Sequence, residues 1–140
     1  PRLTQQPVAN NSYLRLTFNP GIRLLAEDNV VNQKLAKRML EKMGHDVMIV
    51  SNGKEAVEAL DKDKFDVFLT DIQMPEMDGY EATRIIRQAE SEGLRTRIPI
   101  IAMTAYAMES DREMCFEAGM DGYVSKPVRS KELTEALDAI

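Results

Sequence analysis

The sequence contains few of the residues on which several functional classes depend. Its 140 residues include one cysteine and one histidine, which excludes a disulfide framework and the usual zinc-ligand spacings. No glycines form a GxGxxG or Walker loop that could hold phosphates through the backbone. The net charge of −5 argues against a nucleic-acid-binding protein, because such proteins usually carry a basic surface. We therefore expect no direct nucleic-acid partner.

Long hydrophobic runs are also missing. No apolar stretch approaches the roughly 18 residues that a membrane-spanning helix needs, and no signal peptide is visible. We therefore expect a cytoplasmic domain that makes no membrane contact, whether or not a longer parent protein is anchored in a membrane. We expect Cys115 to be a small buried hydrophobic residue. We expect His45, which lies in a predicted turn, to be neither a metal ligand nor a phosphodonor.

The first 20 residues differ in composition from the rest of the chain. Residues 1–20 are rich in proline, glutamine and asparagine and lack a helical period, so we interpret them as a linker or the remnant of an upstream domain. Their apolar side chains, which include Tyr13 and Phe18, would pack on the domain or on a neighbour. Residues 21–140 are long enough to bury a hydrophobic core and are predicted to form one domain.

Beyond residue 21, strand and helix patterns alternate. Strands are predicted over 22–26, 46–50, 66–70, 98–103 and 122–125. Helices are predicted over 30–43, 54–62, 80–91, 107–117 and 130–139. The strands are short apolar runs rather than alternating patterns, as expected when helices cover both faces of a parallel sheet. The pattern predicts an α/β domain with a doubly wound parallel sheet, in which ligands bind beyond the carboxyl ends of the strands.

Three acidic residues follow the ends of two predicted strands. Asp71 comes directly after the strand over 66–70, and Glu27 and Asp28 come directly after the strand over 22–26. If these strands are parallel neighbours, the carboxylates converge, and their mutual repulsion is on the order of several kcal/mol. A bound cation would relieve it, and hard oxygen ligands with room for water favour Mg²⁺. Taken alone, Glu27 and Asp28 could equally be solvated turn residues.

Two further polar residues follow the later strands. Thr104 comes after the apolar run over 98–103, where its hydroxyl group can donate to a phosphoryl oxygen; in the alternative interpretation it caps the next helix. Lys126 follows the strand over 122–125, and Pro127 restricts its backbone and permits a cis peptide bond. The ammonium group of Lys126 suits a phosphoryl oxygen, although a lysine here could also be a plain surface cation.

These motifs jointly resemble the receiver domain of two-component response regulators, over about residues 22–140. The motifs are Glu27-Asp28, Asp71 with Met74-Pro75 and Asp78-Gly79, Thr104-Ala105, and Lys126-Pro127. Three segments are most similar to receivers of hybrid sensor histidine kinases: Ala26-Glu27-Asp28-Asn29, Gln73-Met74-Pro75-Glu76-Met77-Asp78-Gly79 and Ala102-Met103-Thr104-Ala105. The resemblance implies a flavodoxin-like, five-stranded sheet with strand order 2-1-3-4-5.

The resemblance also implies a role for each site residue. Asp71 would be the nucleophile that takes a phosphoryl group from a phosphohistidine. Asp28 and Asp71 would bind Mg²⁺ directly, together with the backbone carbonyl group of Gln73, and Glu27 would act largely through water. Lys126 would pair with the phosphoryl oxygens. In this way a receiver assists its own phosphorylation and dephosphorylation, mainly by positioning and charge neutralisation.

A conformational switch is implied in the same way. Thr104 would turn inward to bond a phosphoryl oxygen, and Tyr123 matches the aromatic residue whose burial changes with that motion. The acyl phosphate would add about −1.5 to −2 units of charge and would need new hydrogen-bond donors. The motion would bias the surface formed by the last strand and the helices on either side of it in the chain. Gln73 and Tyr106 occupy the two positions that tune hydrolysis, and because neither is an acid, we expect no strong acceleration.

The predicted helix over 30–43 provides the expected docking surface for a partner. Val30 points outward beside the acidic residues, which indicates a surface for a phosphohistidine-bearing kinase or phosphotransfer domain; the alternative is an isolated surface valine. The residues expected in the core share another face of this helix: Asn32, Leu35, Ala36, Met39 and Met43.

Other interpretations stay open at this stage. An aspartyl-phosphate hydrolase would need a second acid two residues after Asp71, where the chain has Gln73, and usually a cap domain as well. A stand-alone response regulator would share every motif with the receiver of a hybrid kinase. A phosphorylation-deficient receiver scaffold or a flavodoxin-like cofactor binder is the remaining alternative, although all the expected site residue types are present.

Overall fold

The computed structural model describes residues 22–105 and 109–140, in which five parallel strands form one sheet with the order β2-β1-β3-β4-β5. Strands and helices alternate along the chain: β1 (Ile22–Ala26), α2 (Val30–Lys42), β2 (Asp46–Val50), α3 (Gly53–Lys62), β3 (Val67–Asp71), α4 (Gly79–Ser91), β4 (Ile100–Thr104), α5 (Glu109–Ala118), β5 (Gly122–Ser125) and α6 (Ser130–Asp138). The predicted doubly wound α/β fold and its strand order are therefore confirmed.

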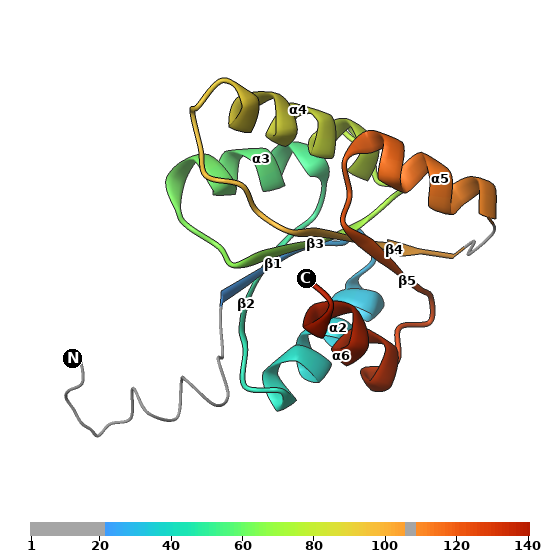
Figure 1. Cartoon of the computed structure of the whole chain (residues 1–140). Helices are drawn as coiled ribbons and strands as arrows, with labels where there is room; N and C mark the ends of the chain where they lie inside the picture. The colour runs from blue at the N-terminus through green and yellow to red at the C-terminus, as the bar shows by residue number, and fades with distance from the viewer. Residues whose placement is uncertain (1–21, 106–108) are drawn as a thin grey trace.

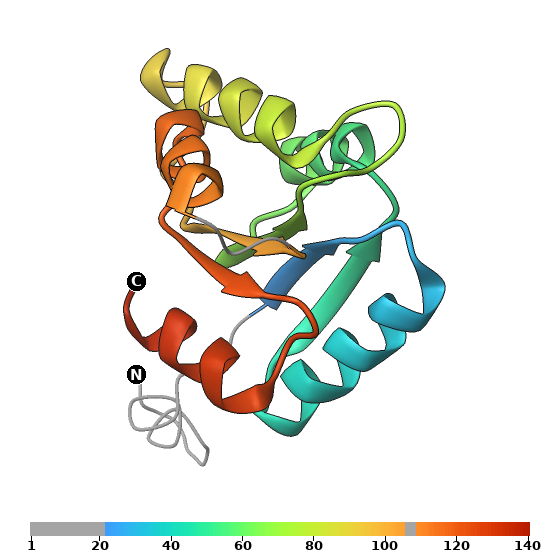
Figure 2. The ribbon, with the colours of Figure 1, turned by 90° about the vertical axis from the view of Figure 1, so that its right-hand side faces the viewer.

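Helices cover both faces of the sheet. Figures 1 and 2 show α3, α4 and α5 on one face and α2 and α6 on the other. β3 and β4 are buried along their whole length, which explains why their sequences are continuous apolar runs. One core cluster lies between the sheet and α3, α4 and α5, and contains Leu24, Phe68 and Ile86. The second lies under α2 and α6 and contains Leu25 and Leu40.

Side-chain caps start three of the helices soon after a strand ends. The side chains of Asn29, Asn52 and Asp78 each accept a hydrogen bond from a backbone N–H group in the first turn of α2, α3 and α4, respectively. Such caps satisfy N–H groups that have no partner within the helix, and each stabilises the protein by about 1 kcal/mol. They also define where the loops at the carboxyl edge of the sheet end.

The observed boundaries differ from the predicted ones by one or two residues. The strand predicted over 66–70 lies at Val67–Asp71, and the strand predicted over 98–103 lies at Ile100–Thr104. Asp71 and Thr104 are therefore the last residues of β3 and β4 rather than the first residues of the loops. Proline at position 99 explains part of the second shift, because it has no N–H group to donate within a sheet.

The predicted core face of the first helix is partly wrong. Leu35, which was expected in the core, is 44% exposed, whereas Leu40 is fully buried together with Ala36. Residues 36 and 40 lie one turn apart on the same face, and Leu35 lies beside that face rather than on it. Val30 is 58% exposed, as predicted, and Val31 is exposed as well. The outer surface of α2 therefore carries more apolar area than the sequence pattern indicated.

Two reactive side chains are not part of the acidic cluster at the carboxyl edge. Cys115 is buried within α5, as expected, and burial raises the pKa of its thiol. His45 directly precedes β2, at the amino edge of the sheet, and its backbone N–H group donates to the carbonyl oxygen of Leu40. Burial, together with the charge of Arg23, lowers the pKa of His45.

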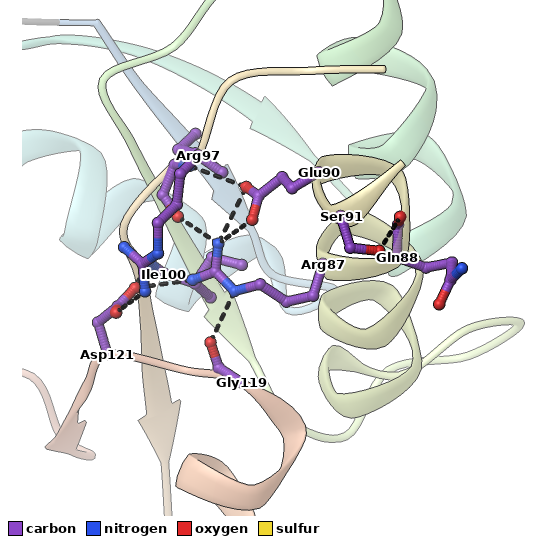
Figure 3. Close-up of polar contacts among 9 residues, drawn as sticks. Arg87, Gln88, Glu90, Ser91, Arg97, Ile100, Gly119 and Asp121 are labelled. Atoms are coloured by element: carbon purple, nitrogen blue, oxygen red, sulfur yellow. Dashed lines mark hydrogen bonds and ion pairs between the residues drawn. The ribbon is translucent and has the colours of Figure 1, made fainter. Parts of the chain in front are cut away.

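The guanidinium group of Arg87 connects α4 to the amino ends of β4 and β5 (Figure 3). Its Nε donates to the carbonyl oxygen of Gly119 at 2.8 Å, and its Nη1 donates to the Glu90 carboxylate at 2.7 Å and to the carbonyl oxygen of Ile98 at 2.8 Å. Its Nη2 donates to the Asp121 carboxylate at 2.8 Å. All five donors of arginine are held in one plane, so a single side chain can bind several acceptors at once.

Candidate functional site

Strand register brings the predicted site residues to one edge of the sheet. In the β1–β3 pair Ala26 lies opposite Thr70, so Glu27 and Asp71 both lie one residue further along. In the β4–β5 pair Thr104 lies opposite Ser125, and the backbone N–H group of Lys126 donates to the carbonyl oxygen of Thr104 at 2.7 Å. Parallel neighbours that end at the same level place these side chains together.

Three carboxylates form a cluster at this edge. Oxygen atoms of Glu27, Asp28 and Asp71 all lie within 4.8 Å of one another. Glu27 and Asp71 are buried, with 1% and 8% of their surface exposed, whereas Asp28 is exposed. Buried like charges at this spacing repel strongly, so the cluster needs a cation or a proton.

Lys126 supplies one positive charge to this cluster. Its Nζ lies 2.8 Å from an oxygen of Glu27 and 2.9 Å from Oδ2 of Asp71. The other oxygen of Asp71, Oδ1, accepts a hydrogen bond from the N–H group of Ile72 at 2.8 Å. Both oxygens of Asp71 are thus oriented by fixed partners. The peptide bond from Lys126 to Pro127 is cis, as the sequence permitted.

Burial and the close pairing with Lys126 shift two pKa values at this edge. Burial raises the pKa of Glu27, against the opposing effect of its hydrogen bond with Lys126. Burial acts to lower the pKa of Lys126, but its hydrogen bonds with Glu27 and Asp71 outweigh burial, so the net shift is upward. The three clustered carboxylates offer hard oxygen atoms at a spacing that fits a divalent cation such as Mg²⁺.

The loop after Asp71 is held against the strand by Gly79. The N–H group of Gly79 donates to the carbonyl oxygen of Ile72 at 2.8 Å, and a Cβ atom at position 79 would lie well under 3.0 Å from the carbonyl oxygen of Asp71. Only glycine permits so close an approach of two backbone segments. The Asp78-Gly79 pair therefore both starts α4 and closes the loop around Asp71.

Gly79→Ala is expected to destabilise the domain and to slow any reaction at Asp71. Alanine would normally stabilise a helical position by about 0.5–1 kcal/mol relative to glycine. The clash with the Asp71 carbonyl oxygen outweighs this gain, and forced overpacking costs about 1–3 kcal/mol. Urea unfolding measures the loss. Gly122→Ala is the matched control, because no atom lies within 4 Å of a Cβ atom built there; equal stability losses in both variants would contradict this account.

The remaining predicted site residues surround a cavity of about 290 Å³ that opens onto Asp71. Thr104 is buried and lines this cavity together with Gln73 and Lys126. α5 begins at Glu109, five residues beyond Thr104, so Thr104 does not cap that helix. Tyr106 lies outside the described residues.

Tyr123 is partly buried in β5, packs on the core beneath α5, and lies 6.0 Å from the guanidinium carbon of Arg112, measured from its ring centre. Such an arrangement is within the range of a cation–π interaction. The ring of Tyr123 thus connects β5 to the surface of α5, on the side of the sheet where the cavity lies.

Sequence reasoning missed several residues around the site. Tyr80, Asp111 and Met114 also line the cavity beside Asp71, although they lie on α4 and α5, outside any motif. A second cavity of about 300 Å³ lies on the other side of Lys126, where Leu35 and Val128 form part of its wall. The packing of the helices on the sheet brings these side chains to the site, and no local sequence pattern predicts that placement.

Comparison with known proteins identifies the family to which this chain belongs. The family model described as the response regulator receiver domain matches residues 24–138. The chain belongs to this family. Its five-stranded sheet, its strand order and the acidic residues at the carboxyl edge are thus features of a receiver domain of two-component systems.

Relatives of this receiver domain are found in histidine kinases. Hybrid signal transduction histidine kinase I of Dictyostelium discoideum is 46% identical over 121 residues, which is 82% of this chain but 7% of that protein. The chain therefore spans a small fraction of the length of the curated relatives it matches. The crystal structure of the receiver domain of sensor histidine kinase PA1611 from Pseudomonas aeruginosa PAO1 has a magnesium ion in its active site cleft. It is 42% identical, with a TM-score of 0.76 and coverage of 86% of this chain and 96% of that one.

A third relative was solved with a partner. The co-crystal structure of the Saccharomyces cerevisiae histidine phosphotransfer signaling protein Ypd1 and the receiver domain of the response regulator Ssk1 matches this chain with a TM-score of 0.77. The identity is 28%, over 83% of this chain and 85% of that one.

Among the described helices of the present receiver domain, none combines the length and apolar character needed to cross a membrane.

Proposed function

We propose that this receiver domain accepts a phosphoryl group on Asp71 from a phosphohistidine, in a reaction that needs Mg²⁺. The observation that carries the proposal is the contact of Lys126 with both Asp71 and Glu27, at an edge where three carboxylates converge. This arrangement combines a nucleophile, a cation for the phosphoryl oxygens and hard ligands for a metal ion. Phosphoryl transfer requires positioning and charge neutralisation more than covalent assistance.

The residues present fit a bound Mg²⁺ ion. Asp28 and Asp71 would hold it together with the backbone carbonyl group of Gln73, and Glu27 would contribute through water. When bound, Mg²⁺ supplies positive charge that stabilises the transferring phosphoryl group. The magnesium ion in the active site cleft of the Pseudomonas aeruginosa receiver domain supports this assignment.

The side chains of the domain would each do one task. An ionised Asp71 attacks through one carboxylate oxygen, and its two hydrogen-bonded partners, Ile72 and Lys126, orient the group before reaction. Lys126 then pairs with the phosphoryl oxygens, because its ammonium group is a compact donor of positive charge. Thr104 lines the same cavity and would turn its hydroxyl group toward a phosphoryl oxygen.

The new charge would act as a switch. The acyl phosphate carries about −1.5 to −2 units of charge and requires additional donors, which Thr104 can provide by moving inward. Space vacated by Thr104 would let the ring of Tyr123 change its burial. Because Arg112 of α5 lies over that ring, the surface of α5, β5 and α6 would respond to phosphorylation. We expect this surface to bind a downstream partner differently in the two states.

The phosphohistidine-bearing partner is proposed to dock beside α2. Val30, Val31 and Leu35 of α2 are 58%, 72% and 44% exposed, and Leu35 also lines the cavity of about 300 Å³ that reaches Glu27 and Lys126. An apolar patch at the entrance to a charged site is typical of an interaction surface. The yeast complex between Ypd1 and the Ssk1 receiver domain supports a phosphotransfer partner of this kind.

The parent protein is proposed to be a hybrid sensor histidine kinase. This receiver domain is proposed to lie in the cytoplasm. Its relationship to the Dictyostelium hybrid kinase supports this choice over a stand-alone response regulator. The division of the chain into a linker over 1–20 and a receiver domain over 21–140 stays a prediction, because residues 1–21 lie outside the described part of the chain.

The test is phosphoryl transfer from a phosphorylated histidine phosphotransfer protein, followed by intact mass with Mg²⁺ or with excess chelator. We expect a gain of one phosphoryl group with Mg²⁺ and at least a 100-fold slower reaction after chelation, taking about 3 kcal/mol as the contribution of the metal. Transfer at equal rates in both conditions would refute the metal requirement. Absence of transfer from every donor would favour the phosphorylation-deficient scaffold.

The same assay tests the docking surface. Val31→Gln is expected to slow transfer from the protein donor while leaving labelling by a small phosphodonor unchanged, because it removes the apolar contact with the partner and adds no charge beside the acidic site. Leu94→Gln is the matched control, since Leu94 is 75% exposed and lies in the loop between α4 and β4 rather than beside the site. If Leu94→Gln slows transfer as much as Val31→Gln, the docking surface is not at α2.

A further inference from the structure

The cavity beside Asp71 carries a second carboxylate that the proposed reaction does not use. Its walls are formed by Asp71, Thr104 and Lys126 on the sheet side and by Tyr80, Asp111 and Met114 on the helix side. Apart from Asp71, Asp111 is the only acidic residue among the described residues that line this cavity. A small molecule that occupies this cavity beside Asp71 therefore shares it with the Asp111 carboxylate.

The charge of Asp111 acts within the cavity. Asp111 is half-buried in the first turn of α5, and it forms no ion pair with another described residue. Tyr80, which lines the cavity with Asp111, is affected: burial raises its pKa to about 12, and interactions with Cys115 and Asp111 add to that rise. Glu109, in the same turn, is exposed and does not line the cavity.

We infer that Asp111 determines phosphodonor specificity by disfavouring donors of high negative charge at Asp71. The inference rests on the proposed function. A fixed negative charge in a cleft with low-dielectric walls repels a dianion more strongly than a monoanion. Lys126 and the metal site attract the phosphoryl group itself, so Asp111 leaves the chemistry intact and selects among the molecules that deliver it.

The chemical step is the same for both kinds of donor. One carboxylate oxygen of Asp71 forms a bond to phosphorus while the bond between phosphorus and the leaving group breaks, and the leaving group takes the bonding electrons. From acetyl phosphate the leaving group is acetate, and no proton moves. From phosphoramidate it is ammonia, which departs from a nitrogen that is already protonated. Donor selection can therefore be separated from reactivity at Asp71 by comparing the two.

The experiment measures initial rates of labelling by intact mass at saturating Mg²⁺ with each donor. At neutral pH, acetyl phosphate is a dianion and phosphoramidate is mainly a monoanion. For Asp111→Asn we expect about a threefold to tenfold higher rate with acetyl phosphate and less than about a twofold change with phosphoramidate. The difference should shrink as salt is raised, because salt screens repulsion. Asp111→Glu, which keeps the charge, should retain the discrimination of the wild type.

Glu109→Gln is the matched control, since it removes a carboxylate from the same helical turn outside the cavity. If Glu109→Gln produces the same selective increase, the effect belongs to the helix end and the inference is overturned. Equal changes with both donors in Asp111→Asn, or an increase that salt does not reduce, also overturn it. If wild-type protein is labelled by neither donor, the proposed function itself fails; if it is labelled normally while the donor ratio of Asp111→Asn is unchanged, only this inference fails.

Discussion

Asp71→Asn is expected to abolish phosphoryl labelling completely. The amide has no ionised oxygen to attack phosphorus, and the acyl phosphate that would carry the label cannot form at this position. The structure points to Asp71 among the three clustered acids because, of the three, it is the one that lines the cavity shared with Thr104 and Lys126. Its two oxygens are also oriented by fixed partners, the N–H group of Ile72 and the ammonium group of Lys126. The measurement is intact mass after incubation with a small phosphodonor and Mg²⁺.

The variant should fold normally, which makes its loss of labelling interpretable. Removing one of three close negative charges relieves repulsion, and Lys126 keeps its contact with Glu27. Asp46→Asn is the matched control: it makes the same chemical change at the exposed first residue of β2, at the opposite edge of the sheet. Continued labelling of Asp71→Asn would move the acceptor to another residue, and equal loss in Asp46→Asn would show a general effect of the substitution.

Arg87→Met is expected to lower the free energy of unfolding by about 3–5 kcal/mol. The substitution keeps an apolar stem of similar length but removes every donor of the guanidinium group. Glu90 and Asp121, whose side chains are only 10% and 20% exposed, would lose their contacts with this cation, as would the carbonyl oxygen of Gly119 (Figure 3). The carbonyl oxygen of Ile98 would lose a donor as well. Asp121 would keep its ion pair with Arg97, whereas Glu90 would have no ion pair left with a described residue. Leaving a mostly buried carboxylate without its cation is costlier than losing an exposed pair.

Urea unfolding measures this loss, and Arg84→Met is the control. Arg84 lies one turn earlier on α4, is exposed and forms no ion pair with a described residue; its guanidinium carbon lies 5.9 Å from the ring centre of Tyr80. Its loss should cost less than about 1 kcal/mol. Equal destabilisation by the two variants would show that the network around Arg87 contributes no more than an exposed arginine. Because the network lies at the amino edge, folded Arg87→Met should still be labelled at Asp71.

The local sequence determined which segments form strands and helices, and it placed the polar site residues at the carboxyl ends of the strands. Short apolar runs alternating with amphipathic segments permit few structures other than a parallel sheet covered by helices on both faces, because each strand must bury both of its faces. In such a sheet, strand ends meet at one edge, so the sequence alone predicts that Glu27, Asp28, Asp71, Thr104 and Lys126 lie together. Their chemical types then indicated a metal ion and a phosphoryl group.

Only the tertiary structure determined which side chains from distant segments of the chain contact one another. Arg87 binds partners up to 34 residues away in the chain, Lys126 contacts two acids nearly 100 and 55 residues before it, and Asp111 reaches the cavity from a different helix. The orientation of α2 about its own axis, relative to the sheet, likewise determines that Leu40 is buried in the core while Leu35 is exposed. Hydrophobic periodicity defines a broad stripe on a helix, and side-chain packing selects the few residues within it that are buried. Contacts between distant segments follow from that packing, so no local pattern contains them.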